Sequence, residues 1–596
     1  MNAATVGAGA PDPLAAARAW LAEDPDPGTR AELAELIGAA GDEATDGAAA
    51  GGGTGPTARA ELAARFSGTL EFGTAGLRGE LGAGPMRMNR AVVIRAAAGL
   101  AAYLRDRAGK GSGGAEGADT AGNAGDTGPA GATDARPVVV IGRDARHMSE
   151  RFALDTAAVV TGAGLRAVLL PRPLPTPVLA FAVRRLGAAA GVMVTASHNP
   201  PRDNGYKVYL GDGSQIVPPA DADIAARIAA VGPLAGVPRP EGTGEILGEE
   251  IIEAYLERAG SVTAPDSPRG IRTVYTPLHG VGGPLVVEAF RRAGFPEPVV
   301  VAEQAEPDPD FPTVAFPNPE EPGAMDLAFA TARRERPDLV IASDPDADRC
   351  AVAVPDASRE EAWRMLRGDE VGALLAAHLI RRGATGTFAA SVVSSSLVER
   401  MARAAGLPFR YTLTGFKWLS RVEGLRYGYE EALGYCVDPE GVRDKDGVTA
   451  ALAIAELASG LREAGRGVTD LLDDLALEHG LHTTDQLSVR VADLSLIGAA
   501  MTRLRETPPV SLAGAPVTRA ADLRDGVDGL PPTDGLRYDL ADGRIIVRPS
   551  GTEPKLKCYL EVVVPVTDRE GLPAARAEAV RRLAALRSDL AEAAGL

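Results

Sequence analysis

Short apolar runs recur along the chain, and each one ends in a polar or glycine-rich loop before a helical pattern begins. The first three runs cover 138–141, 167–170 and 191–194, and apolar positions at helical spacing fill 149–162 and 176–186 between them. This alternation of strand and helix predicts a largely parallel sheet with helices on its faces. A helix over 249–259 closes this part of the chain.

The same alternation returns twice further along. Strands over 273–276, 299–302 and 339–342, with a helix over 284–293, predict a second α/β unit. A third begins with a helix that Asp369 is expected to cap and a strand over 388–393. After about residue 483 the pattern is mixed α+β and ends in a helix over 573–594. The fold class is therefore α/β, with three related α/β domains of mixed, largely parallel sheets and a smaller α+β C-terminal domain.

Two segments interrupt these patterns. Residues 38–58 and 109–136 are rich in glycine, alanine, aspartate and threonine and offer few large apolar side chains to a core. Such composition favours a flexible linker and a disordered surface insertion. The predicted domains are 1–58 (helices over 12–37 and the linker), 59–262, 263–357, 358–482 and 483–596.

Composition narrows the classes of partner. The 596 residues carry a formal charge of −18, which argues against nucleic acid or an anionic membrane as the main partner. The three cysteines are far apart and lack the CxxC spacing of a zinc site, so a reducing cytoplasm fits best. The N-terminus has no basic region, and no apolar run has transmembrane length.

Lysine is rare in this chain. Of 62 basic residues only six are lysine, at 110, 207, 417, 445, 555 and 557. The ammonium group of lysine is compact and its pKa shifts readily, so a surviving lysine is a candidate for proton transfer or anion binding. All but Lys110 lie in segments that other signals also single out. Lys207 and Lys445 are the two candidates for a general acid or base.

Ser197 follows the apolar run 191–194, in the stretch Thr195-Ala-Ser-His-Asn-Pro-Pro201. The two prolines fix their own φ and restrict the residue before them, so the strand cannot continue. Ser197 is therefore expected on a tight loop at a strand end, where open α/β sheets place their chemistry. An ordinary turn serine is the alternative interpretation.

Three aspartates, Asp344, Asp346 and Asp348, alternate directly after the strand over 339–342. On an extended backbone alternate side chains face the same way, so three carboxylates would converge and offer the all-oxygen ligands that Mg²⁺ prefers. An EF-hand is excluded because Arg349 and Pro355 stand where it needs glycine and glutamate. A solvated acidic turn stays open, as does a phosphatase of the haloacid-dehalogenase type, which the position of Asp348 disfavours.

Three further segments offer groups that bind phosphate or sugar. Arg548, Ser550, Gly551 and Thr552 combine a guanidinium, two hydroxyls and backbone N–H groups in a phosphate nest. Arg78 lies in a glycine-rich loop over 73–79, and a carboxylate at Glu430, in a loop of aromatic residues and glycine, can accept hydrogen bonds from sugar hydroxyls. No GxSxG surrounds Ser197 and no P-loop is present, so the set favours phosphoryl transfer over hydrolysis by a serine triad.

The motifs TASHNP, DPDADR, GYEEALG and RPSGTEPK, in this order, closely resemble those of the α-D-phosphohexomutases. FGTAGLRG, TPLHGVGG, TGFKW and VRDKDG look like the phosphoglucomutase branch, which includes the phosphopentomutases, and the match spans about 72–561. The resemblance implies four domains around a central cleft. It implies that Ser197 is a phosphoserine, and that Asp344, Asp346 and Asp348 hold Mg²⁺ together with the Ser197 phosphate.

The resemblance also implies a reaction: interconversion of glucose 1-phosphate and glucose 6-phosphate through a bisphosphate, with glucose 1,6-bisphosphate as activator. Mannose or pentose phosphates are alternative substrates, and a metal-dependent sugar phosphatase is a further alternative. One departure bears on the sugar, because Ala432 stands where many relatives carry serine. Expected partners are small sugar phosphates, with a monomer or weak homodimer. The motifs assign catalysis to Ser197, Lys207, Arg78 and Lys445, and substrate binding to His198, Arg349, Thr414, Gly415, Glu430, Arg548, Ser550, Gly551 and Thr552.

Overall fold

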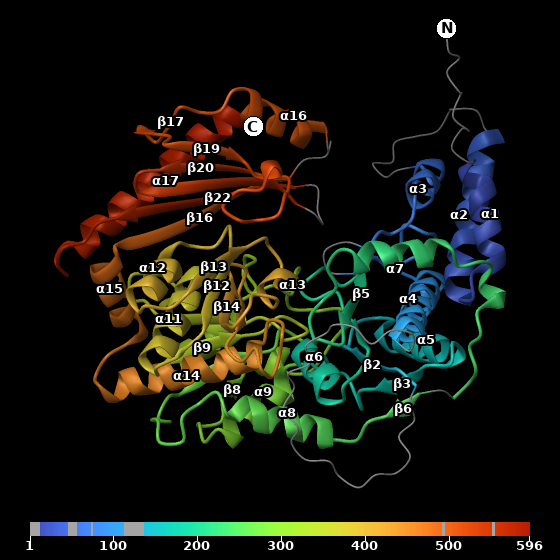
Figure 1. Cartoon of the computed structure of the whole chain (residues 1–596), viewed down its shortest axis with the longest axis horizontal. Coiled ribbons are helices and arrows are strands. Elements are labelled where there is room, and N and C mark those ends of the chain that lie inside the picture. The colour runs from blue at the N-terminus through green and yellow to red at the C-terminus, as the bar shows by residue number, and fades with distance from the viewer. Residues whose placement is uncertain are drawn as a thin grey trace. The chain divides into compact units, whose positions relative to one another are not determined.

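The computed structural model describes residues 12–45, 57–72, 76–111, 136–242, 244–490, 495–550 and 555–595, and the chain divides into two compact units (Figure 1). The first unit comprises Met1–Leu174, Ala182–Glu250 and Asp308–Asp310. The second comprises Pro175–Phe181, Ile251–Pro307 and Phe311–Leu596.

A six-stranded sheet forms the centre of the first unit, in the order β1-β5-β4-β2-β3-β6. β2 pairs in parallel with β3 and β4, and β3 with β6, whereas β5 is antiparallel to β4 and to β1. The predicted parallel core is confirmed and carries antiparallel strands at one edge. The strands are β1 (Leu77–Glu80), β2 (Val138–Arg143), β3 (Arg166–Leu169), β4 (Ala190–Val194), β5 (Asp203–Leu210) and β6 (Glu245–Ile246).

The helices of the first unit follow the predicted periodicity, and α5 covers the predicted residues 149–162. α2 runs on to Thr45, so the prediction of a flexible linker from residue 38 is wrong at its start. Buried Leu33, Ala40 and Leu62 pack together there, and that packing outweighs the weak helix propensity of the glycines. Residues 112–135 of the predicted insertion lie outside the described residues. The helices are α1 (Pro13–Glu23), α2 (Pro27–Thr45), α3 (Ala58–Arg65), α4 (Arg90–Gly111), α5 (Ser149–Gly162) and α7 (Ala220–Ala229), with the 3₁₀ turn η1 (Leu234–Gly236).

The second unit repeats this sheet design twice. Its first sheet has the order β11-β10-β9-β7-β8, and its second the order β13-β12-β14-β15. In both, the inner strands are parallel and the antiparallel strands lie at one edge. The strands are β7 (Thr273–Thr276), β8 (Val299–Val300), β9 (Leu339–Ala342), β10 (Ala351–Pro355), β11 (Trp363–Met365), β12 (Thr387–Ser391), β13 (Phe409–Thr412), β14 (Leu425–Glu430) and β15 (Gly434–Cys436).

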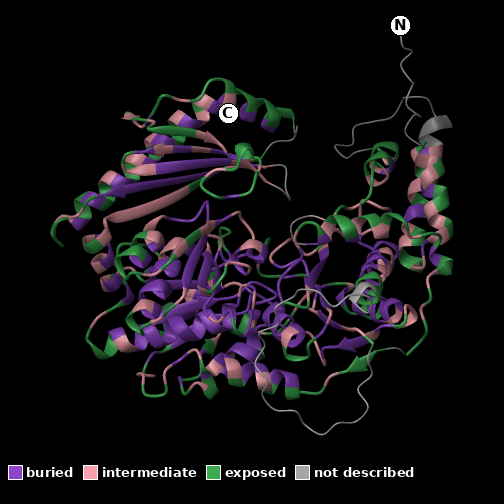
Figure 2. Ribbon diagram, in the orientation of Figure 1, coloured by how far each residue is buried: buried purple, intermediate pink, exposed green. Residues whose placement is uncertain are grey.

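Among the helices of the second unit, α14 (Gly447–Glu463) is buried along almost its whole length (Figure 2). α6 (Thr176–Arg185) begins in the second unit and ends in the first. The others are α8 (Glu250–Gly260), α9 (Gly283–Arg292), α10 (Asp326–Glu335), α11 (Gly368–Arg381), α12 (Leu397–Ala404), α13 (Phe416–Leu419) and α15 (Val468–His479), with η2 (Ala302–Gln304).

The cap predicted for α11 is wrong in one respect. Glu370, not Asp369, satisfies the helix start, because its carboxylate accepts the N–H of Arg367 at 2.8 Å. Asp369 instead accepts the N–H of Ser395 at 2.7 Å and the hydroxyl of Thr484 at 2.8 Å. Tertiary partners therefore compete successfully for this side chain.

The C-terminal segment is the predicted smaller α+β domain. Its sheet, β16-β22-β21-β20-β19, is antiparallel throughout. Apolar side chains of α16 and α17 pack on one face of it, while Ile546 and Tyr559 on the other face pack against Val392 and Val393. The elements are β16 (Leu481–Arg490), α16 (Ser495–Glu506), β17 (Ser511–Leu512), β18 (Ala515–Pro516), β19 (Arg519–Asp522), η3 (Leu523–Asp525), β20 (Leu536–Leu540), β21 (Gly543–Pro549), β22 (Lys555–Val564) and α17 (Leu572–Ala594).

A buried carboxylate on α14 ties three segments of the second unit together. Glu456 accepts hydrogen bonds from the N–H of Ala264 at 2.6 Å, from His378 Nε2 at 2.7 Å and from Arg382 Nη1 at 2.9 Å. Ser267 Oγ donates to the same carboxylate at 2.5 Å. The loop after α8 is thereby fixed to both α11 and α14.

Candidate functional site

The predicted nucleophile lies where the sequence places it, on a tight loop after β4. Ser197 is buried and has a φ of +53°, in the left-handed region. Its N–H donates to Thr195 Oγ1 at 2.9 Å, and its Oγ lies 3.1 Å from His198 Nδ1. The hydroxyl is thus held in a turn whose backbone an L-residue adopts only when its surroundings impose it.

Neighbouring strands bring two more predicted residues to this sheet edge. Arg78 lies on β1 opposite Gly205, and its Nη1 donates to Asn199 Oδ1 at 3.0 Å. Lys207 is buried on β5 opposite Met193. Arg78, Ser197, His198 and Lys207 therefore belong to adjacent elements of the first unit, while residues 73–75 of the glycine-rich loop lie outside the described residues.

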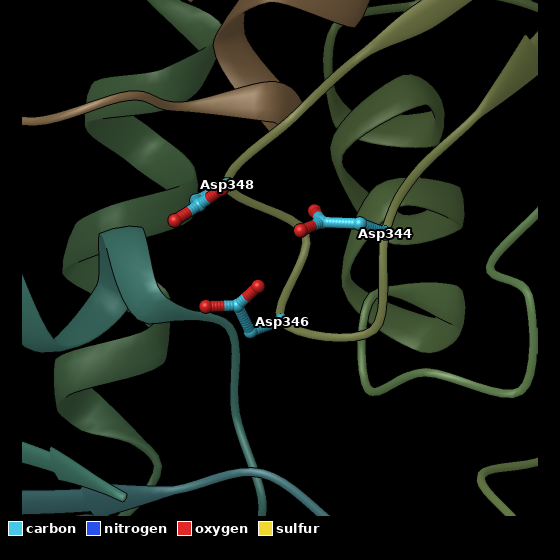
Figure 3. Close-up of side chains that lie close together, drawn as sticks. All are labelled: Asp344, Asp346 and Asp348. Atoms are coloured by element: carbon cyan, nitrogen blue, oxygen red, sulfur yellow. The ribbon is translucent and has the colours of Figure 1, made fainter. Parts of the chain in front are cut away.

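The predicted metal ligands converge in the second unit, between β9 and β10 (Figure 3). Asp344, Asp346 and Asp348 are fully buried, and one carboxylate oxygen from each lies within 4.8 Å of the others. The expected extended backbone is wrong. The loop is a turn, with the N–H of Ala347 donating to Asp344 O at 2.9 Å and Ala347 at a φ of +50°. Turn geometry, not strand alternation, aims the three side chains inward.

Two cations and a hydroxyl surround the triad. Lys445 Nζ lies 3.1 Å from Asp348 Oδ2, and Arg349 Nε lies 3.9 Å from Asp344 Oδ2. Thr176 Oγ1 donates to Asp346 Oδ2 at 2.5 Å. Three carboxylates against two cations leave a net negative charge, and their oxygens are the ligand type that Mg²⁺ takes. The donor set therefore fits Mg²⁺.

Charges around the triad shift the pKa values of nearby groups. Burial favours the neutral amine of Lys445, but Asp348 and Asp444 outweigh that effect and raise its pKa. Lys445 is therefore an ammonium at neutral pH. Burial raises the pKa of Glu430, against the lowering effect of Lys445 and of the N–H of Gly415.

The residues predicted to bind sugar and phosphate form hydrogen bonds with one another in the second unit. Glu430 at the end of β14 accepts a hydrogen bond from the N–H of Gly415. Arg548 Nη1 donates to Thr414 Oγ1 at 2.7 Å. The N–H of Ser550 bonds to Lys555 O at 2.8 Å, and Gly551 and Thr552 lie outside the described residues.

Sequence reasoning did not single out three side chains that the structure brings to these loops: Thr176, Asp144 and Arg146. Thr176 Oγ1 donates a hydrogen bond to Asp346. Glu431, which the sequence places beside Glu430, accepts hydrogen bonds from Ser391 and Ser394 at 3.1 Å. Asp144 and Arg146 lie beside the Ser197 loop. Their position directly after β2, at the carboxyl end of a parallel strand, is a signal that could have marked them.

Four family models match successive segments of the chain. They describe the α/β/α domains I, II and III of phosphoglucomutase/phosphomannomutase, over 124–233, 253–357 and 367–478, and the C-terminal domain, over 487–584. The chain belongs to the phosphoglucomutase/phosphomannomutase family. It is a phosphosugar mutase with three α/β/α domains followed by a C-terminal domain.

Curated relatives of this phosphosugar mutase carry several names. The chain is 46% identical to the probable phosphomannomutase of Haemophilus influenzae over 80% of this chain and 93% of the relative. It is 36% identical to the probable phosphoribomutase of Schizosaccharomyces pombe, covering 91% and 92%. The identity to the phosphoglucomutase of Staphylococcus haemolyticus is 32%, covering 84% and 91%. Mutase chemistry is common to all of these names, and the sugar differs.

A solved structure has the same fold. The phosphoglucomutase/phosphomannomutase family protein of Burkholderia thailandensis aligns with a TM-score of 0.64 at 20% identity, over 88% of this chain and 97% of that one. Within the described residues, no helix has both the length and the apolar character needed to cross a bilayer.

Proposed function

We propose that this mutase interconverts glucose 1-phosphate and glucose 6-phosphate through a phosphoserine at Ser197. The observation that carries the proposal is the convergence of three buried aspartates on a turn whose oxygens suit Mg²⁺. The left-handed Ser197 on a loop that presents a nucleophile supports it. Mg²⁺, when bound by Asp344, Asp346 and Asp348, supplies positive charge that stabilises a transferring phosphoryl group.

The chain's own residues account for the proton and phosphoryl movements. The free C6 hydroxyl of glucose 1-phosphate attacks the phosphorus on Ser197, and the bond from phosphorus to Ser197 Oγ breaks. A base takes the hydroxyl proton, and Ser197 Oγ gains one. The bisphosphate then returns its C1 phosphoryl group to Ser197, which leaves glucose 6-phosphate. Lys207 or Lys445 serves as the general acid or base.

The remaining residues bind the sugar and its second phosphate. Glu430 accepts hydrogen bonds from sugar hydroxyls, and Arg548 with Ser550 binds the phosphate that is not reacting. Arg349 and Arg78 add positive charge that attracts the phosphate groups of the substrate. Glucose 1,6-bisphosphate acts as the activator, because it can phosphorylate Ser197 in an enzyme that has lost its phosphate.

Pentose phosphates are a second candidate substrate class, and one sequence feature favours them. Ala432 removes a hydroxyl from the sugar loop, and relatives named phosphoribomutase and phosphopentomutase align over 85% or more of this chain. A site with fewer polar contacts to a hexose discriminates less against a smaller sugar.

The test is turnover of glucose, mannose, ribose and deoxyribose 1-phosphates with Mg²⁺ and a trace of the matching bisphosphate. We expect glucose 1-phosphate to give the highest kcat/KM, and Ser197→Ala to abolish turnover of every sugar. Ser67→Ala, an exposed serine elsewhere in the first unit, is the matched control. Full activity of Ser197→Ala would refute the phosphoserine mechanism, and a higher kcat/KM for ribose 1-phosphate would replace glucose with the pentose.

We also infer a cytoplasmic enzyme that acts on small molecules as a monomer or weak homodimer. Its three cysteines are buried free thiols, and the charge of −18 disfavours binding to nucleic acid or anionic membranes. Light scattering behind a sizing column tests the oligomeric state. A stable assembly larger than a dimer would contradict it.

A further inference from the structure

A turn that directly follows β2 lies against the Ser197 loop. Arg146 in this turn is buried, and its guanidinium donates to four backbone carbonyls of that loop. Nη2 bonds to Ser197 O and to Asn199 O, each at 2.6 Å. Nη1 bonds to Pro200 O at 2.8 Å and to Asp203 O at 3.2 Å. One side chain thus contacts the loop at the nucleophile and at three positions after it.

Asp144 fixes the orientation of this arginine. The carboxylate accepts the N–H of Arg146 at 3.0 Å and the hydroxyl of Ser149 at 2.6 Å. Its Oδ2 lies 3.4 Å from Arg146 Nε. The N–H of Asp144 bonds to Val194 O at 3.0 Å, at the end of the strand that leads to the serine. The turn after β2 therefore contacts the Ser197 loop on both sides of the nucleophile.

The sequence of the loop explains why it needs such a donor. Pro200 and Pro201 have no N–H, so the loop cannot pair its backbone as a strand would. Ser197 at a φ of +53° adopts a left-handed conformation that is unfavourable for an L-residue. A planar guanidinium presents several donors in a fixed fork, which a lysine ammonium does not reproduce.

We infer that Arg146 is a positioning residue for phosphoryl transfer: it holds the Ser197 backbone in the left-handed turn that sets the place of Oγ. This inference rests on the proposed phosphoserine function. Arg146 acts through the main chain and does not touch the sugar phosphate. Its loss should therefore affect the transfer steps more than the binding of substrate.

The test compares Arg146→Lys and Arg146→Ala with wild type. Arg151→Lys is the matched control, an exposed arginine on α5 that pairs with Asp155 at 3.2 Å. We expect Arg146→Lys to lower kcat by about 10- to 100-fold, the scale of a misplacement near 1 Å, with KM changed less than about threefold. The rate at which the bisphosphate phosphorylates Ser197, followed by mass spectrometry, should fall by the same factor. Added guanidinium should restore part of the activity of Arg146→Ala.

Several outcomes would overturn the inference. One is phosphorylation of Ser197 in Arg146→Lys at the wild-type rate, and another is a rise in KM with unchanged kcat. Loss of folded protein in both variants, measured by thermal unfolding, would assign Arg146 to general stability instead. Failure of the proposed function would give another result in the wild-type enzyme itself. That enzyme would then turn over sugar phosphates without forming phosphoserine, or would not turn them over at all.

Discussion

Glu456 offers a quantitative test of how the second unit is held together. Its carboxylate accepts four hydrogen bonds, from Ala264 N, Ser267 Oγ, His378 Nε2 and Arg382 Nη1. Burial alone would raise its pKa, but these bonds outweigh burial and lower the pKa from 4.5 to about 2. That shift corresponds to about 2–3 kcal/mol of stability.

The sign of the pH dependence follows from the lowered pKa. A carboxylate whose folded pKa lies below its unfolded value stabilises the fold fully above about pH 5 and not at all below about pH 2. Glu456→Gln removes this titration. Wild type and variant should therefore differ by about 2–3 kcal/mol at about pH 7, and the difference should shrink as the pH falls from about 4.5 towards 2.

Denaturant unfolding of both proteins across this pH range is the assay, read by circular dichroism and by tryptophan fluorescence. Two of the three tryptophans, Trp363 and Trp418, lie in the second unit. Glu463→Gln, an exposed carboxylate at the end of the same helix, serves as the control and should leave stability unchanged. A difference that stays constant down to about pH 3 would refute the electrostatic origin, because the variant would then act through packing alone.

Two further predictions concern the loops that carry the chemistry. Gly447→Ala should lower the affinity for Mg²⁺ at least about tenfold in calorimetric titration. A Cβ at this position would lie 2.4 Å from Arg349 O and 2.8 Å from Ala347 O, so the aspartate turn would have to move. Unchanged affinity would contradict this prediction. Arg548→Lys should raise KM about tenfold or more with little change in kcat, since a lysine lacks the guanidinium fork for phosphate, and a fall in kcat alone would instead point to a role in transfer.

Periodicity and turn chemistry predicted the three parallel-core sheets, and α5 ends where its apolar spacing ends. The loops carrying Ser197, Asp346 and Glu430 were also predictable, because strand ends mark them. The backbone conformation by which the three aspartates converge could not be predicted. It depends on Ala347 in a left-handed turn, and alanine carries no sequence signal for that conformation, unlike glycine.

Contacts between distant segments could not be read from the sequence. Thr176 bonds to Asp346 across 170 residues and Arg146 to Ser197 O across 51. Each belongs to a helix start or turn that looks ordinary by itself, and local patterns carry no information on which loop packs beside which. The cap of α11 failed for a related reason, because Asp369 had better partners outside its own helix.

The scarcity of lysine has a practical consequence for chemical labelling. Every lysine whose side chain the structure describes is buried or half-buried, and all five belong to segments with candidate chemistry: Lys207, Lys417, Lys445, Lys555 and Lys557. In the part of the chain whose side chains the structure describes, the other basic surface residues are arginines, which reagents that acylate amines do not modify. Acylation at these five lysines, read by peptide mapping, therefore reports whether ligand covers the candidate site.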